Sequence, residues 1–119
     1  MKVTSFNLNV TSEHPERLTA FYRDIVGLDP AEGMGDGAFK VAGAHFLIDG
    51  HSDTKGDNPA PQRTLINFFV EDLAAEQARL EAEGVKFIRT AGKEYWGGVI
   101  STFLDPDGNY AQLIEFKPE

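Results

Sequence analysis

The chain repeats one order of predicted elements twice, with an offset of 60 residues. Residues 7–10 (NLNV) align with residues 67–70 (NFFV), and each segment is followed by a helical pattern and then by strand-like runs. A module of about 55 residues with one helix and four strands buries only one face of its sheet. Two such modules, or two chains of them, must therefore share a core or a cavity. The repeat predicts an α+β fold built from two βαβββ modules.

Length and charge limit the classes of protein that remain. The chain has 119 residues and a formal charge of -8, and it has no cysteine, which excludes disulfides, cysteine nucleophiles and cysteine zinc sites. An acidic chain without a cluster of Lys and Arg argues against a nucleic-acid partner. No apolar run approaches the roughly 18 residues of a membrane span. We expect one domain over 1–119, a cytoplasmic location, and neither a nucleic acid nor a membrane as partner.

The first module is expected within about residues 1–50. Residues 3–10 alternate well enough to predict a half-buried strand. A helix should follow, capped by Thr11 or Ser12, with Pro15 in its first turn and Gly27 at its end. Its apolar positions recur at helical spacing and predict a core-facing stripe: Leu18, Phe21, Tyr22, Ile25 and Val26.

The rest of the first half reads as a loop, a hairpin and a connector. Residues 29–37 are rich in Gly, Asp and Pro and are expected to form a loop. Their glycines resemble a phosphate loop only superficially, since the stretch contains no Lys, follows no parallel strand and precedes a strand rather than a helix. The runs 38–42 and 44–48 flank Gly43 and predict a hairpin. The polar stretch from Gly50 to Gln62 predicts a connector, placed at 51–62.

The second module is expected over 63–119. The pattern predicts a strand at 64–70, a helix at 73–83 capped by Asp72 and closed by Gly84, and a strand at 85–89. Two further strands, 99–104 and 110–116, are joined by Asp105-Pro106-Asp107-Gly108-Asn109. Proline fixes φ in this turn and glycine allows positive φ, so the sequence predicts a tight hairpin.

Two motifs within this order resemble those of the vicinal oxygen chelate superfamily. They are FYRDIVGL at 21–28, which is similar to the end of that family's first helix, and FLDPDGN at 103–109, which is similar to its last turn. The likeness extends from Val3 to Phe116. It implies paired βαβββ modules whose curved mixed sheets enclose a ligand cavity, usually completed in a homodimer. The superfamily includes glyoxalase I, extradiol dioxygenases, epimerases, fosfomycin-resistance transferases and bleomycin-binding resistance proteins, so the resemblance does not select a reaction.

The resemblance also provides a test for a metal site. Enzymes of this superfamily hold a divalent ion with His and Glu side chains in the cavity. The family's usual pattern puts two ligand positions five residues before the valines that end residues 7–10 and 67–70, and two more four residues after Gly43 and Gly108. These four positions fall on Ser5, Leu65, Leu47 and Gln112. None of these is a usual ligand for such an ion. The second module contains no histidine at all. We therefore expect no catalytic metal and no cofactor.

His45 is the one histidine that falls on a predicted cavity face. If Leu47 and Gln112 face the cavity, alternation places His45, Asp49, Tyr110 and Ile114 on the same face. His45 could then move a proton near neutral pH, with Asp49 orienting its ring. The alternative is a hydrogen-bonded or surface histidine with no catalytic part.

Three asparagines and an aromatic pair can each be interpreted as ligand contacts or as structural residues. By alternation Asn7, Asn9 and Asn67 point into the cavity, where their amides would suit a polar neutral ligand; the alternative is that they hydrogen-bond one another across the sheet. Tyr95 and Trp96 precede two glycines and would suit stacking on a planar or cationic ligand. Otherwise Trp96 covers the sheet edge or a dimer interface.

These observations predict a small-molecule-binding protein. The expected function is sequestration of an organic ligand or drug, without a catalytic metal, in a cavity at a homodimer interface. The alternatives are a glyoxalase-like lyase, isomerase or dioxygenase with atypical metal ligands, a metal-independent enzyme using His45, and a subunit that binds only another protein. The residues expected to contact the ligand are Asn7, Asn9, His45, Leu47, Asn67, Phe69, Trp96, Tyr110 and Gln112.

Overall fold

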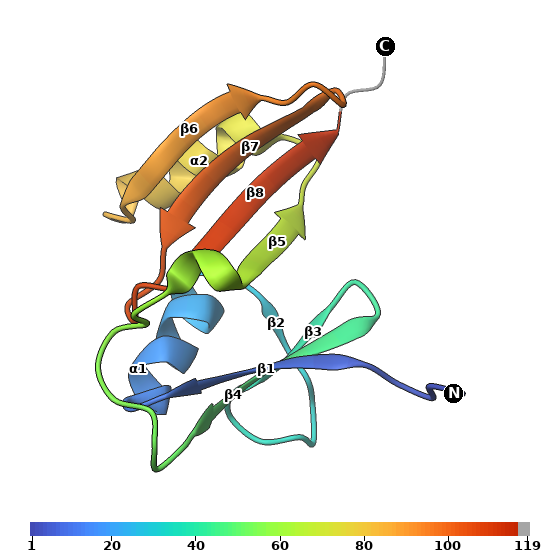
Figure 1. The fold of residues 1–119 in the computed structure, drawn as a ribbon, viewed down its shortest axis with the longest axis vertical. Helices are drawn as coiled ribbons and strands as arrows, with labels where there is room; N and C mark the ends of the chain where they lie inside the picture. Colours follow the sequence, from blue (N-terminus) through green and yellow to red (C-terminus); the bar gives the residue numbers. More distant parts are fainter. Residues whose placement is uncertain (117–119) are drawn as a thin grey trace. The chain divides into compact units, whose positions relative to one another are not determined.

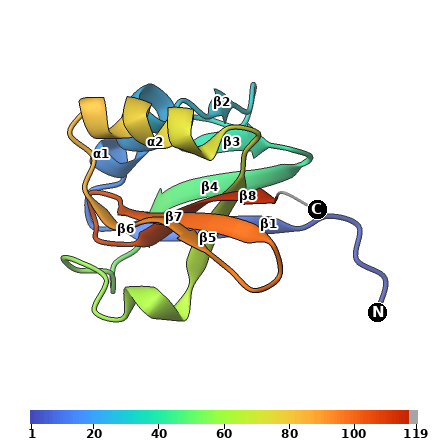
Figure 2. The same cartoon turned by 90° about the horizontal axis from the view of Figure 1, so that it is seen from above.

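The structure, a computed structural model, describes residues 1–116 and divides into two compact units, Met1–Gly56 and Asp57–Glu119. Each unit contains one four-stranded mixed sheet with its own helix packed on one side of it (Figure 1). Figure 2 shows, for each unit, the helix lying against one face of its own sheet. The described residues contain no helix with the length and hydropathy of a membrane span.

The first unit has the strand order β1-β4-β3-β2. Its strands are β1 (Asn7–Ser12), β2 (Asp29–Pro30), β3 (Ala38–Val41) and β4 (Ala44–Gly50). The first and last strands pair in parallel, and the other pairs are antiparallel. A parallel neighbour requires a crossover, which the helix between β1 and β2 supplies.

The helix of the first unit begins as α-helix and continues as π-helix. The α1 segment (Pro15–Ala20) runs directly into η1 (Phe21–Val26), which ends at Gly27 with φ 87°. The backbone N–H groups of Gly27 and Leu28 both donate to the Tyr22 carbonyl, at 3.0 and 2.9 Å, so the last turn is widened. Pattern reasoning predicts a single regular helix here and misses the wide turn, because spacing of apolar residues does not distinguish the two.

Three residues of the predicted apolar stripe, Leu18, Phe21 and Tyr22, lie in the core of the first unit, and Ile25 and Val26 are half-buried. Leu18 and Tyr22 have no exposed surface, and the Tyr22 ring lies 4.9 Å from that of Phe46 on β4. Phe46 in turn contacts Phe39 on β3, with ring centroids 6.4 Å apart. This aromatic cluster fixes which face of the sheet meets the helix, because residues adjacent to Phe46 on β4 must point to the other side.

Three predictions for the first unit need correction. The first strand starts at Asn7 rather than Val3 and runs on to Ser12, since β4 offers partners as far as Gly50. The segment 29–37 is not wholly a loop, because its first two residues form β2. The helix N-cap is His14, while Ser12 Oγ accepts from the His14 N–H at 2.9 Å just before it.

The second unit repeats the architecture of the first, with the strand order β5-β8-β7-β6. Its elements are a 3₁₀ turn η2 (Pro61–Arg63), β5 (Leu65–Phe69), α2 (Leu73–Ala82), β6 (Phe87–Lys93), β7 (Gly98–Leu104) and β8 (Tyr110–Phe116). Again the first and last strands are parallel. The prediction of two βαβββ modules is confirmed.

Helix α2 is fixed to its sheet by polar contacts as well as by apolar packing. Asp72 Oδ1 accepts from Ala75 N–H at 3.1 Å, which confirms the predicted cap. The buried carboxylate of Glu115 on β8 accepts from Leu73 N–H at 2.9 Å. Ser101 Oγ on β7 donates to Gln77 Oε1 at 2.6 Å. Ser101 and Glu115 therefore lie on the helix face of the sheet, and their strand neighbours lie on the other.

The predicted turn between β7 and β8 is present and is organised by one carboxylate. Asp105 Oδ1 accepts from the N–H groups of Asp107 and Asn109, at 2.9 and 3.0 Å, and Oδ2 accepts from Asn109 Nδ2 at 2.8 Å. Gly108 adopts φ 76°. The predicted hairpin is confirmed, and the structure adds that the Asp105 side chain closes its turn.

Strand β6 departs from its prediction. It begins at Phe87 and continues to Lys93, four residues beyond the expected end at Arg89. Its pairing with β7 shifts twice, between Phe87 and Arg89 and between Arg89 and Gly92. Ala91 has φ 43° there, and its N–H donates to Ser101 Oγ at 2.9 Å. Such bulges break the period of two, which is why alternation fails to predict this strand.

Among the glycines with positive φ, Gly37 is the one whose replacement should lower the free energy of unfolding most. It has φ 69°, its carbonyl accepts from Ile48 N–H at 2.6 Å, and a Cβ there would collide with the Ile48 carbonyl oxygen. Gly43 has φ 97° but open space around it. We expect Gly43→Ala to lower the free energy of unfolding by about 1 to 2 kcal/mol from backbone strain alone. Gly37→Ala should lower it by about 3 kcal/mol or more, because the collision adds to the strain.

Chemical denaturation of both variants measures these costs. Equal losses in the two variants would contradict the close approach of the segment before β3 to β4.

Candidate ligand-binding site

Each sheet has one face against its helix and one turned away from it, which we call the far face. In the second unit, register places Asn67, Gln112, Thr102 and Arg89 opposite one another on the far face, so that a polar row crosses all four strands. Apolar side chains flank this row on both sides. They are Leu65, Tyr110 and Leu104 on one side, and Phe69, Ile114 and Ile100 on the other.

The centre of the polar row is held by one hydrogen bond. Gln112 is buried, and its Nε2 donates to Thr102 Oγ1 at 2.8 Å. No group in the part of the chain that the structure describes hydrogen-bonds to Gln112 Oε1 or to the Asn67 amide. The bond fixes the Gln112 side chain while its acceptor oxygen stays free. The row can therefore offer an acceptor from Gln112 and both a donor and an acceptor from Asn67.

The end of the row on β6 is an ion pair. Arg89 Nη2 lies 2.7 Å from Glu94 Oε1, and the guanidinium lies over Gly92, where any Cβ would meet it. Thr102 and Arg89 are far-face residues that the sequence reasoning missed. Counting back from the turn at 105–109 could have placed Thr102 opposite Gln112. The bulges in β6 hide Arg89 from any such count.

The far face of the first unit has its own polar row. There Asn7, His45 and Lys40 lie opposite one another, with Asp29 beyond them on β2. Asn9 and Leu47 form the next position along β1 and β4. The alternation that predicts Asn7, Asn9, His45 and Leu47 on one face is correct.

The register also corrects the comparison between the modules. Asn67 lies opposite Gln112, and its repeat equivalent Asn7 lies opposite His45. His45, and not Leu47, is therefore the counterpart of Gln112. Counting from Gly43 gives the wrong residue by two positions, because the hairpin at Gly43 is tighter than the turn at 105–109.

The structure tests two expectations from the sequence: that the asparagines hydrogen-bond one another, and that Asp49 orients the His45 ring. Within their own units and among the described residues, the amides of Asn7, Asn9 and Asn67 make no side-chain hydrogen bond, so they are not paired across their sheets. His45 is half-buried, and Asp49, which lies opposite Thr11, does not hydrogen-bond it in the described part of the chain. The expected orientation of the His45 ring by Asp49 is thus not found.

Trp96 lies folded back onto its own sheet. Its ring stacks on Phe116, with centroids 6.1 Å apart and planes at 18°, and it covers Gly98 so closely that a Cβ there would overlap the ring. Tyr95 beside it is 99% exposed. Trp96 therefore covers the sheet in the present arrangement, and a ligand that stacks on it has only its outer side to use. Phe69 is 67% exposed and lines a shallow hollow with Phe116.

The residues at the expected metal positions do not fit a divalent ion. With the corrected register they are Ser5, His45, Leu65 and Gln112, and only the imidazole is a usual ligand. Among residues 1–116, no three His, Cys, Asp or Glu side chains lie close enough together to hold a metal. The amides and the hydroxyl of the polar row can recognise hydrogen-bonding groups. The four expected metal positions supply one usual ligand, the His45 imidazole, which is too few to hold a divalent ion.

Comparison with known proteins gives one family. The model of the Glyoxalase/Bleomycin resistance protein/Dioxygenase superfamily matches residues 6–113. A search of curated proteins finds no match. The comparison therefore supplies a family but no individual activity.

Solved structures with the same fold cover nearly the whole chain. A glyoxalase/bleomycin resistance protein/dioxygenase family enzyme from Burkholderia phytofirmans PsJN is 17% identical, with a TM-score of 0.75 over 93% of this chain and 97% of that one. Lactoylglutathione lyase from Agrobacterium tumefaciens is 19% identical, with a TM-score of 0.73 over 97% and 96%. A protein from Bacillus anthracis described as belonging to the glyoxalase family is 18% identical, with a TM-score of 0.77 over 98% of both chains. At these identities the likeness shows the fold alone.

The stack of Trp96 on Phe116 can be tested through the single tryptophan of the chain. We expect Phe116→Ala to move the Trp96 emission to longer wavelength and to lower the free energy of unfolding by about 1 kcal/mol, the value of an aromatic pair. Tyr95→Ala, which removes an exposed neighbouring ring, should change neither quantity. An unshifted spectrum in Phe116→Ala would mean that the two rings do not stack.

Proposed function

This chain belongs to the Glyoxalase/Bleomycin resistance protein/Dioxygenase superfamily, and on that premise we propose that it binds a small organic molecule on the far faces of its sheets. The binding cavity would be completed by a second copy of the chain, as a homodimer in the cytoplasm. The proposed role is to bind and sequester the ligand without a catalytic metal.

The observation that carries this proposal is the polar row of the second unit. The Asn67 amide and the Gln112 Oε1 atom have no hydrogen-bond partner among the described residues, while apolar rows flank them on both sides. An unpaired amide and an unpaired amide oxygen on an otherwise apolar surface favour a ligand with hydrogen-bonding groups along its middle and apolar edges. The fixed Gln112 side chain supports binding because it loses little rotamer freedom when a ligand arrives.

The proposal includes the candidate ligand contacts predicted from sequence. In the first unit these are Asn7, Asn9, His45 and Leu47. In the second they are Asn67, Phe69, Trp96, Tyr110 and Gln112. Thr102 and Arg89 join them because they complete the polar row. An acidic chain would favour a cationic ligand over an anionic one during approach.

A second candidate function rests on His45. Its place opposite Asn7 and beside Lys40 is the counterpart of Gln112, a position where this superfamily commonly carries a functional side chain. A metal-independent enzyme could use its imidazole as a general base. A lyase, isomerase or dioxygenase with atypical ligands is the other enzymatic alternative, and it would need donors beyond His45.

Metal titration separates sequestration from the metalloenzyme alternative. We expect Ni²⁺, Zn²⁺ and Mn²⁺ to leave the Tm unchanged after chelator treatment, because His45 alone among the four positions is a usual ligand. His14→Ala controls for adventitious binding at an exposed histidine. A saturable rise in Tm that disappears in both His45→Ala and Gln112→Ala would replace the proposal with a metalloenzyme.

Ligand recovery tests the binding face itself. We expect native mass spectrometry of protein from its host to show a bound small molecule, and Asn67→Leu to weaken its affinity about tenfold by removing one hydrogen-bonding partner. Gln62→Leu, a similar change outside both sheets, should leave the affinity unchanged. Equal affinity in wild type and Asn67→Leu would remove the polar row from the binding site.

A further inference from the structure

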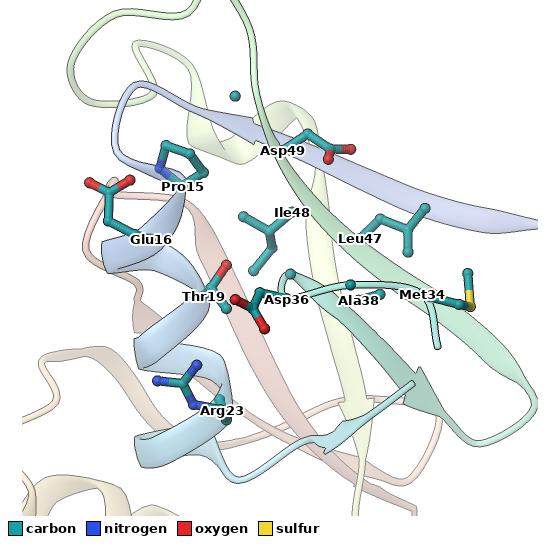
Figure 3. A pocket seen from close by; sticks show the side chains of 13 residues that line it. Pro15, Glu16, Thr19, Arg23, Met34, Asp36, Ala38, Leu47, Ile48 and Asp49 are labelled. Atoms are coloured by element: carbon teal, nitrogen blue, oxygen red, sulfur yellow. The ribbon is translucent and has the colours of Figure 1, made fainter. Parts of the chain in front are cut away.

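The first unit contains a groove at one end of its sheet, where β3 begins and β4 runs on past it; we call it the edge groove. Its volume is about 630 Å³, and its walls are α1, the segment 34–37 before β3, and the last residues of β4 (Figure 3). This groove differs from the polar row of the first unit, since none of Asn7, His45 and Lys40 lines it. Of the residues in the proposed function, Leu47 alone also lines this groove.

A buried hydroxyl faces this groove without a partner. Thr19 on α1 is only 6% exposed, and no described residue hydrogen-bonds to its side chain. Every fully buried polar side-chain atom in residues 1–116 has a partner, so the Thr19 hydroxyl must be reached from the groove and not sealed behind it. Figure 3 shows this side chain beside Asp36. An unpaired hydroxyl in a nearly closed setting favours a ligand that bonds it.

The segment opposite α1 leaves this hydroxyl uncovered. A Cβ at Gly37 would lie 3.4 Å from Thr19 Oγ1, so the glycine keeps that side of the hydroxyl open. Asp36 precedes Gly37 and is exposed at the groove. The hydroxyl and a carboxylate thus lie on neighbouring parts of one hollow.

The charge of the groove is negative. Glu16, Asp36 and Asp49 line it, and among its lining residues Arg23 is the one cation. Arg23 is already engaged by Asp24, with Nε to Oδ1 at 2.9 Å and Nη2 to Oδ2 at 3.0 Å. The hydrogen bond to Asp24 raises the pKa of Arg23 and lowers the pKa of Asp24. The three carboxylates therefore set the sign of the field in the groove.

Apolar side chains occupy the end of the groove toward the start of the segment 34–37. Met34 is 52% exposed there, and Leu47 lies beside it on β4 in Figure 3. A ligand that fits both ends needs a cationic head and a short apolar body. A bare metal ion fits poorly, because no three acidic or histidine side chains among the described residues are grouped to hold one.

We propose that this edge groove binds an organic ammonium ion. The ammonium group donates to the Thr19 hydroxyl and to the Asp36 carboxylate, and its alkyl chain lies along Met34 and Leu47. An ammonium has three donors and no acceptor, which matches an acceptor hydroxyl beside a carboxylate. Glu16 and Asp49 add attraction without direct contact.

Titration of the full chain with n-hexylammonium, hexan-1-ol and hexanoate tests the charge and the chain separately. The readout is the backbone amide shifts of Thr19 and Gly37 by NMR. We expect saturable shifts with n-hexylammonium and at least about tenfold weaker binding of hexan-1-ol and hexanoate. Equal binding of hexan-1-ol and n-hexylammonium, or equally tight Ca²⁺ binding at these amides, would overturn the proposal.

Substitutions assign the contacts. Thr19→Val and Asp36→Asn should each weaken n-hexylammonium binding about five- to tenfold. Glu32→Gln, an exposed change just before the segment 34–37, should not. Asp36 is exposed, so its variant keeps the test valid if Thr19→Val fails to fold. Unchanged affinity in Asp36→Asn would overturn the assignment.

The result is independent of the proposed function. Binding at the edge groove is read at Thr19 and Gly37, whereas ligand binding at the far face of the second unit is read through Asn67→Leu. Either site can fail its test while the other passes.

Discussion

The parallel pairing of the first and last strands in each module is the constraint on which the other features depend. It brings β1 against β4 and β5 against β8, and it requires a crossover that the helices provide. Once the helix lies on one side of the sheet, the register of the strands determines which side chains lie on the other side. The polar row from Asn67 to Arg89 exists because, at one position along the sheet, the paired residues of all four strands have their side chains on the same face.

The two units use this shared frame for different surfaces. The polar row of the second unit lies between apolar rows and holds Gln112 in place through Thr102. The row of the first unit contains an imidazole and an ammonium side chain, His45 and Lys40. A duplicated fold has thus kept its backbone pairing while the chemistry of the two faces has diverged. Relatives at 17 to 19% identity share this frame, which is why their likeness is informative about fold and not about ligand.

Much of the fold is readable from the sequence because its signals are local. The strand at 110–116, the Asp72 cap and the turn at 105–109 follow from alternation, capping and turn chemistry, and the structure has all three. The candidate site is less readable. Alternation places Asn7, His45 and Leu47 on one face, but the match of His45 to Gln112 depends on how many residues the Gly43 hairpin uses. The π-helical turn and Arg89 depend on backbone geometry that residue spacing does not encode.

The two register shifts in β6 change which of its side chains lie on each face of the sheet. In an unbroken strand Arg89 and Glu94, five positions apart, would project to opposite sides. Here the irregularity between Arg89 and Gly92 reverses the phase, and the two charges meet at 2.7 Å. A one-residue insertion or deletion in an edge strand can therefore exchange the set of side chains offered to a ligand while the neighbouring ladder stays intact. Divergence within such a fold can proceed by length changes at this edge as well as by substitution.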